Sequence, residues 1–235
     1  MKVRVKFAKE GAMKFIGHLD IMRYFQKAVR RADIGAAFSE GFSPHMIMSF
    51  AAPLGVGITS SGEYFDMELT QSRSSEELVS RLNAQMAEGM RVLSVRKVPD
   101  GKASKAMSLV AAADYTVAFR EGKEPRGCWQ DRVDEFLSQD QILVWRKTKR
   151  SEGETDIRPW IYELKAVKDG LSMRLSAGSV HNLKPELVAE AFYKYVGEEP
   201  QPFAWQVHRG EIYADLGDEN ERKLVTLESL GENIE

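Results

Sequence analysis

Apolar residues recur with two different periods over the first hundred residues of the chain. Residues 2–9 carry an apolar side chain at every second position, the period of a strand with one buried side: Val3, Val5 and Phe7. Over residues 18–32 the spacing changes to three and four, which predicts an amphipathic helix with its apolar stripe on Leu19, Met22, Phe25, Val29 and Ala32. We expect Gly35 to end this helix.

The same two patterns continue to residue 98. Residues 45–50 and 63–70 predict two strands, and residues 72–86 open with serines and early glutamates, as a helix N-terminus does. Residues 90–98 predict a further strand before a Pro-Asp-Gly turn. The resulting order of strand, helix, strand, strand, helix and strand is that of the ferredoxin-like fold.

The second half of the chain repeats this order with additions. Strands are expected over 114–120, 141–150, 155–167, 171–178 and 204–215, and helices over 128–139 and 184–196. We therefore predict an α+β fold of tandem ferredoxin-like (βαββαβ) domains, residues 1–100 and 113–216, with an extra strand or hairpin in the second. A linker over 101–112 would join them, and an acidic C-terminal tail would follow over 217–235. The alternative for the second half is an irregular α+β domain.

Composition narrows the class of protein. With 43% hydrophobic and 29% charged residues the chain can build a core, and its net charge of −2 means that any affinity for nucleic acid must come from a local patch. Cys128 is the only cysteine, which excludes an internal disulfide framework and thiolate metal clusters. We find no signal peptide or membrane-length apolar run, and no histidine at metal-ligand spacing. We expect a cytoplasmic protein without cofactor, metal or membrane partner.

Cations cluster on the helix predicted over residues 18–32. Arg23, Lys27 and Arg30 lie at i, i+4 and i+7, and Arg31 flanks them, a spacing that suits contacts to RNA phosphates. The alternative is a solvated helix face whose last arginines offset the helix dipole. His45 follows a Gly-Phe-Ser-Pro turn that should lie near the end of this helix, so His45 is a further candidate for phosphate contact.

A second set of candidate cations lies in the second half. The hairpin expected around residue 150 would carry Arg146, Lys147, Lys149 and Arg150, with Arg158 on the returning strand. A basic β-ribbon of this kind can lie along phosphates, although lysines also protect strand edges from aggregation. Lys184 closes the Gly-Ser-Val-His-Asn loop, which could take an anion; alternatively, Ser179 and Asn182 are ordinary capping residues.

The polar face of the first predicted sheet argues against base stacking. Arg4 and Lys6 should face Asp66 and Glu68 across neighbouring strands, forming ion pairs on an exposed surface. Tyr64 is the one clear aromatic candidate there, whereas RNA-recognition sheets use paired aromatics. Binding would therefore use helix and loops instead.

Two long segments resemble a bacterial family of radical-SAM-associated proteins of unknown activity: FIGHLDIMRYFQKAVRRADI and FSEGFSPHMIMSFAAPLGVGITSSGEYFDMEL. The matching segments of the second half are DIRPWIYEL and LSAGSVHNLKPELV, so the resemblance extends to about residue 195. In that family the domain occurs alone or fused behind a radical-SAM enzyme. This chain lacks the three-cysteine cluster of a radical-SAM domain, so the resemblance implies a partner enzyme acting in trans. Met46 after His45 departs from the family's proline-rich turn.

These observations predict a non-catalytic accessory protein that binds RNA or presents a substrate to a radical-SAM RNA-modifying enzyme. Two alternatives stay open. One is an interaction partner of a radical-SAM enzyme without nucleic acid. The other is a metal-independent endoribonuclease using His45 as general acid–base, an analogy with repeat-RNA processing enzymes that share tandem ferredoxin-like domains.

Overall fold

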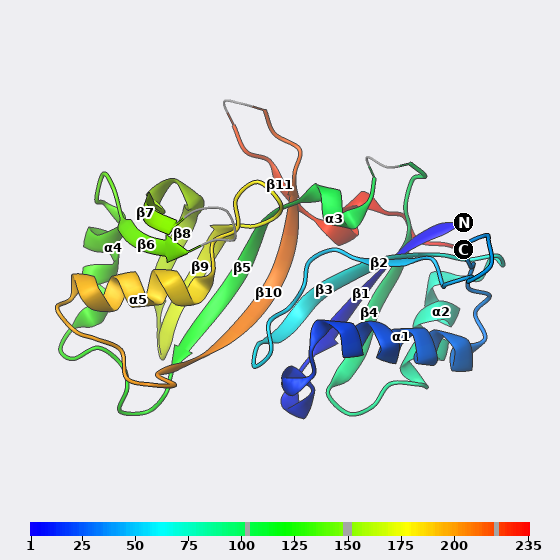
Figure 1. Cartoon of the computed structure of the whole chain (residues 1–235), viewed down its shortest axis with the longest axis horizontal. Coiled ribbons are helices and arrows are strands. Elements are labelled where there is room, and N and C mark those ends of the chain that lie inside the picture. Colours follow the sequence, from blue (N-terminus) through cyan, green and yellow to red (C-terminus); the bar gives the residue numbers. More distant parts are fainter. Residues whose placement is uncertain (102–103, 148–151, 219–220) are drawn as a thin grey trace. The chain divides into compact units, whose positions relative to one another are not determined.

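The chain folds as a mixed α+β protein in which the strand pairs with a described register are all antiparallel (Figure 1). The computed structural model describes residues 1–101, 104–147, 152–218 and 221–235. They form two compact units. The first unit comprises Met1–Ala111 and Glu211–Glu235, and the second comprises Ala112–Gly210. Within the described ranges, no helix is long and apolar enough to cross a membrane.

The first unit follows the element order expected from the hydrophobic periods. Its main elements are β1 (Lys2–Lys9), α1 (His18–Ala32), β2 (Met48–Phe50), β3 (Thr59–Glu68), α2 (Ser75–Asn83) and β4 (Met90–Lys97). Shorter elements are η1 (Gly11–Phe15), α3 (Ala106–Leu109), β11 (Leu224–Thr226) and η4 (Leu227–Leu230). The strand order is β4-β1-β3, with β2 also paired to β3.

Local chemistry sets the ends of the two main helices. The Ser74 hydroxyl accepts a hydrogen bond from the Glu77 backbone N–H at 3.1 Å, which caps α2. Helix α1 ends before the expected Gly35, because Asp33 takes the left-handed conformation at φ 50°. Its buried stripe also differs from the expected one: Leu19 is exposed, and Ile21 and Ala28 are buried instead.

An aromatic cluster fills the core beneath α1. Phe25 has no exposed surface, and its ring centroid lies 4.7 Å from that of Phe7 and 4.8 Å from that of Phe65. The Phe50 ring completes the cluster at 5.1 Å from Phe65. These tilted and edge-on arrangements suit the quadrupoles of the rings. The first unit therefore has a dense core that fixes α1 against the sheet.

The polar face of the first sheet is buried, so the expectation of exposed ion pairs is wrong. Arg4 and Asp66 are cross-strand partners as expected, but they are only 1% and 4% exposed. The Arg4 guanidinium donates to both Asp66 carboxylate oxygens, at 2.8 and 3.2 Å, and to the Leu227 carbonyl at 3.0 Å. The Ala106 N–H also donates to Asp66, at 2.8 Å. Residues far along the chain thus cover this face.

Lys6 forms ion pairs with Glu211 and Glu228, which lie near the C-terminal end of the chain, and not with Glu68. Its ammonium donates to Glu211 at 2.7 Å and to Glu228 at 3.0 Å. The Tyr64 hydroxyl donates to the other Glu211 oxygen at 2.6 Å, and the Tyr64 ring is buried. Tyr64 is therefore unavailable for base stacking. The predicted acidic tail over 217–235 contains β11 and η4, and Leu227 is fully buried in the first unit.

Because of this network, the stability of the first unit should decrease at alkaline pH. Burial lowers the pKa of Lys6, but the hydrogen bonds and charges of Glu211 and Glu228 outweigh burial and raise it above the ordinary 10.5. Burial, followed by the Glu211 charge, raises the pKa of Tyr64 above 10.0. Each raised pKa stabilises the folded state at pH values below the pKa that the group has in the unfolded chain. This stabilisation is lost as pH rises above that value.

We therefore expect the urea midpoint to fall as pH rises above about 10. In the Lys6→Met variant the fall should be shallower, because one of the two groups no longer titrates. Urea unfolding followed by circular dichroism at each pH measures both slopes. Equal slopes for the natural chain and the variant would show that Lys6 does not contribute to this pH dependence.

The second unit is also a mixed α+β unit and has a separate hairpin. Its elements are β5 (Val110–Phe119), η2 (Trp129–Asp131), α4 (Arg132–Leu137), β6 (Leu143–Lys147), β7 (Glu152–Asp156), η3 (Arg158–Trp160), β8 (Ile161–Val167), β9 (Gly170–Ser176), α5 (Pro185–Tyr195) and β10 (Trp205–Asp215). The strand order is β10-β5-β9-β8, while β6 and β7 pair separately. The strand expected over 155–167 is thus divided by η3, whose first turn contains Pro159.

Candidate nucleic-acid interface

The cations of α1 form an exposed face of the first unit. Arg23, Lys27, Arg30 and Arg31 are all exposed. Asp20 pairs with Arg23 at 3.3 Å, and both side chains are largely in solvent. Among the residues that the structure describes, Arg23 is the only one of the four with a carboxylate partner. The face therefore keeps a strong positive charge, which an exposed pair of this kind neutralises only weakly.

The last turn of α1 holds its arginines against neighbouring segments. The Arg30 guanidinium lies 5.9 Å from the centre of the Phe38 ring, and Arg31 donates to the side chain and the backbone carbonyl of Gln85 at 3.3 Å. Contacts to rings and neutral amides orient an arginine without removing its charge. Both guanidinium groups remain available to an anionic partner.

His45 lies in a short loop beside this end of α1. Its Nδ1 is 2.8 Å from the Ser39 hydroxyl, and the His45 N–H donates to the same hydroxyl at 3.1 Å. The Phe38 ring contacts Arg30, and Phe38 forms an isolated antiparallel β-bridge with Met46, the residue that follows His45. The structure thus brings His45 into the same region as Arg30, as expected. The two hydrogen bonds to Ser39 hold the His45 residue within its own loop.

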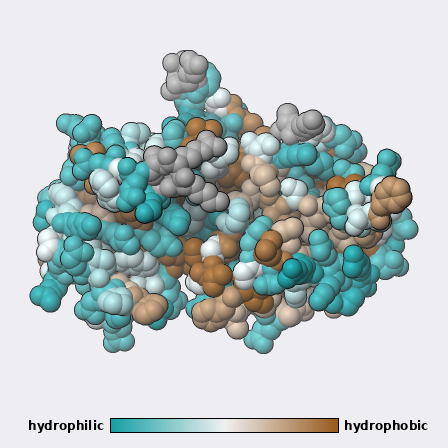
Figure 2. Space-filling model, in the orientation of Figure 1, coloured by the Kyte–Doolittle hydropathy of each residue, from teal (hydrophilic) through white to brown (hydrophobic). Residues whose placement is uncertain are grey.

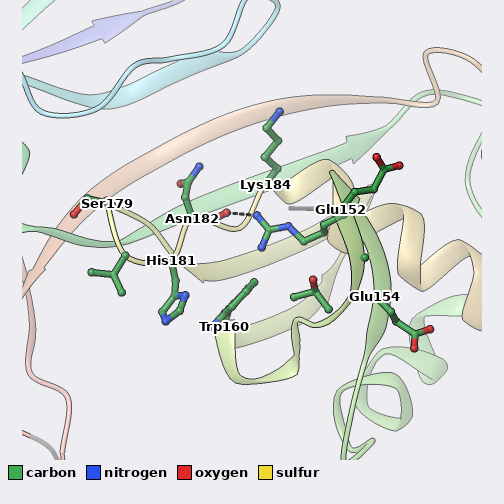
Figure 3. A pocket seen from close by; sticks show the side chains of 12 residues that line it. Glu152, Glu154, Trp160, Ser179, His181, Asn182 and Lys184 are labelled. Carbon is green, nitrogen blue, oxygen red and sulfur yellow. Dashed lines mark hydrogen bonds between the residues drawn. The ribbon is translucent and has the colours of Figure 1, made fainter. Parts of the chain in front are cut away.

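A cavity of about 620 Å³ opens in the second unit between the β6–β7 hairpin and the loop before α5 (Figure 3). At its centre the His181 ring stacks on the Trp160 ring, with centroids 4.8 Å apart and planes inclined by 25°. The Arg146 guanidinium lies 5.0 Å from the Trp160 centroid and donates to the Asn182 carbonyl at 3.0 Å. Lys184 lines the same cavity and is exposed. The second unit therefore combines aromatic rings with cations in one hollow.

The candidate cations of the second unit fall into four groups. Arg146 and Lys184 line the cavity, whereas Lys147 pairs with Glu152 at 3.1 Å. Lys149 and Arg150 lie outside the described residues. Arg158 is on η3 and not on a returning strand, and its guanidinium donates to the Leu137 carbonyl at 2.6 Å. That contact makes Arg158 a half-buried structural anchor and not a surface cation.

Trp160 and His181 were not among the predicted binding residues. Both lie in segments that carry the family resemblance of the second half, DIRPWIYEL and LSAGSVHNLKPELV. Their place in these two segments is the sequence signal that could have identified them. Across the described part of the chain, no group of three or more histidine, cysteine or acidic side chains could hold a metal ion.

The chain belongs to a bacterial family described as "Uncharacterized protein conserved in bacteria (DUF2344)", which matches residues 2–185. A search of curated proteins finds no match. Among solved structures, the chain is similar to one in "Crystal Structure of a Cbf5-Nop10-Gar1 Complex", with 10% identity and a TM-score of 0.47. That match covers 89% of this chain, which spans 48% of the length of the other.

Proposed function

We propose that this protein is a cytoplasmic, non-catalytic RNA-binding accessory protein that presents its substrate to a radical-SAM RNA-modifying enzyme in trans. The observation that carries the proposal is the exposed cationic face of α1, where one of four cations has a carboxylate partner among the described residues. Phosphate contacts need such a local positive patch, because the whole chain has a net charge of −2. The radical-SAM partner rests on the family resemblance.

We further propose that each unit is a ferredoxin-like fold, which makes the protein a tandem of such domains. In the first unit the elements run β1-α1-β2-β3-α2-β4, with strand order β4-β1-β3-β2. In the second unit β5, α4, β8, β9, α5 and β10 follow the same sequence, with strand order β10-β5-β9-β8. The β6–β7 hairpin is then an insertion after the first helix of the second domain.

Charge reversal on α1 tests the proposed function. We expect Arg30→Glu/Arg31→Glu to bind a structured RNA at least tenfold more weakly at low salt, because two phosphate contacts become repulsive. The slope of log affinity against log salt should also become shallower, by about 0.7–0.9 for each lost contact. Filter binding over a range of salt concentrations measures both quantities.

The matched control reverses the same number of charges on exposed β4 side chains, in Arg91→Glu/Lys97→Glu. This variant has the same net charge as the α1 variant, so it corrects for long-range repulsion. Equal losses in the two variants would contradict a specific role for α1. No binding of RNA by the natural chain at low salt would exclude the proposed function.

An apolar patch favours the protein-partner alternative as a second candidate. Phe15, Leu19 and Val56 are each more than 60% exposed. The Gly57 N–H donates to the Lys14 carbonyl at 2.8 Å, which joins η1 to the β2–β3 loop. Figure 2 shows hydrophobic residues gathered over these two segments. Exposed patches of this kind are typical of protein interfaces. Co-purification of a radical-SAM enzyme that resists nuclease and salt would favour this alternative.

A further inference from the structure

We infer that the cavity beside α5 binds one unpaired nucleotide of a single-stranded RNA, with its base stacked on His181 and its phosphate held by Arg146. This inference rests on the proposed function and adds the kind of RNA that the protein selects. It is carried by side chains of the second unit, whereas the proposed function is carried by α1 of the first.

The stacked rings supply a platform for a base. His181 is an exposed residue, and one face of its ring is covered by Trp160. A planar base on the other face would extend the stack by one member. The Trp160–His181 centroid distance of 4.8 Å lies within the range of about 4.5–7 Å seen for stacked aromatic pairs. Stacking on aromatic rings is the usual way in which proteins hold unpaired bases.

The charges around the stack suit a phosphate. Arg146 is fixed from two directions, by the Trp160 ring and by the Asn182 carbonyl, so little further ordering is needed when it binds an anion. Lys184 also belongs to the lining, but Figure 3 shows its side chain directed away from His181. The carboxylates of Glu152 and Glu154 also belong to the lining, but Figure 3 shows them directed away from His181 and Asn182. Arg146 is therefore the cation that lies beside the rings.

The shape of the site favours an unpaired nucleotide over a duplex. The volume of about 620 Å³ falls within the range of about 300–1,000 Å³ typical of small-ligand clefts. A paired base is stacked within its own helix and would have to leave it to reach His181. A duplex could still contact the α1 cations through its phosphates, which carry no information on pairing.

Binding of a 12-nucleotide single-stranded RNA and of the same sequence as a duplex tests the inference. We expect the full chain to bind the single strand more tightly. His181→Ala should weaken single-strand binding roughly tenfold, the size expected for one lost stack, and leave duplex binding unchanged. Trp160→Phe should keep the stack but abolish a fluorescence quenching that the single strand causes in the natural chain. Phe203→Ala, an exposed ring outside the cavity lining, is the matched control.

Each alternative outcome has a distinct meaning. Unchanged single-strand affinity in His181→Ala, together with a loss in Arg30→Glu/Arg31→Glu, would overturn the inference and leave the proposed function standing. No RNA binding by the natural chain would remove both. Adenosine monophosphate has the same base and phosphate chemistry, and its binding as tightly as the 12-nucleotide RNA would identify a free-nucleotide site and overturn the assignment to RNA.

Discussion

Replacing Asp66 with Asn should lower the free energy of unfolding by about 3–5 kcal/mol, the cost of breaking a buried ion pair from one side. Arg4 is 1% exposed, and Asp66 is the only carboxylate partner recorded for it within the described ranges. The amide cannot neutralise the guanidinium, and it replaces one of two accepting oxygens by a donor. Urea denaturation measures the loss.

The control for this substitution is Glu68→Gln, which removes the same charge two residues further along β3. Glu68 is exposed at the end of the strand, so we expect a change of at most about 0.5 kcal/mol. If Asp66→Asn were as mild as Glu68→Gln, the Arg4 charge would have to be solvated in the folded protein. The buried arrangement would then be wrong.

The Phe25→Ala variant should lose about 3–5 kcal/mol of stability, because it leaves a cavity among rings that cannot collapse fully. Phe25 is fully buried and contacts Phe7, Phe50 and Phe65. The same change should loosen α1, and RNA affinity should fall with it. Urea unfolding and filter binding on the same preparation measure the two effects.

Two further variants separate packing from general hydrophobicity. Phe25→Leu keeps most of the volume, so its loss should be clearly smaller. Phe42→Ala removes a fully exposed ring and should leave the unfolding free energy nearly unchanged. A similar loss for Phe25→Ala and Phe42→Ala would contradict the core position of Phe25.

The period of apolar residues predicted the elements of the first unit because packing on one face dictates that period. The helix predicted over residues 18–32 is present as α1, although it ends before the expected Gly35. The stripe assignment was wrong at Leu19, since a spacing of three or four does not tell which residues of the first turn face the sheet. Ile21 serves this role instead.

The burial of charge on β1 could not be predicted from local pattern. Arg4 and Lys6 alternate with apolar residues, which is the pattern of a half-exposed strand. Their covering partners lie far along the chain, since the sequence separation is 205 residues for Lys6 and Glu211 and 223 for Arg4 and Leu227. Such partners become visible only when the chain path is known.

The exposed cations of the candidate interface could be predicted from the sequence, whereas its stacked aromatic rings could not. The α1 cations are exposed because they lie away from the apolar stripe, as the sequence indicated. Trp160 and His181 are 21 positions apart in the sequence. Their stacking depends on the β8–β9 pair that separates them. A tryptophan after Arg-Pro carries no local sign of that contact.

The division of the first unit between the two ends of the chain bears on its synthesis. Domains generally fold as units while the ribosome elongates the chain. Here residues 1–111 emerge early, but Leu227 and Glu228, which meet Arg4 and Lys6, are translated only after the whole second unit. Arg4 and Lys6 of the nascent first unit therefore lack these partners until about a hundred further residues have been added.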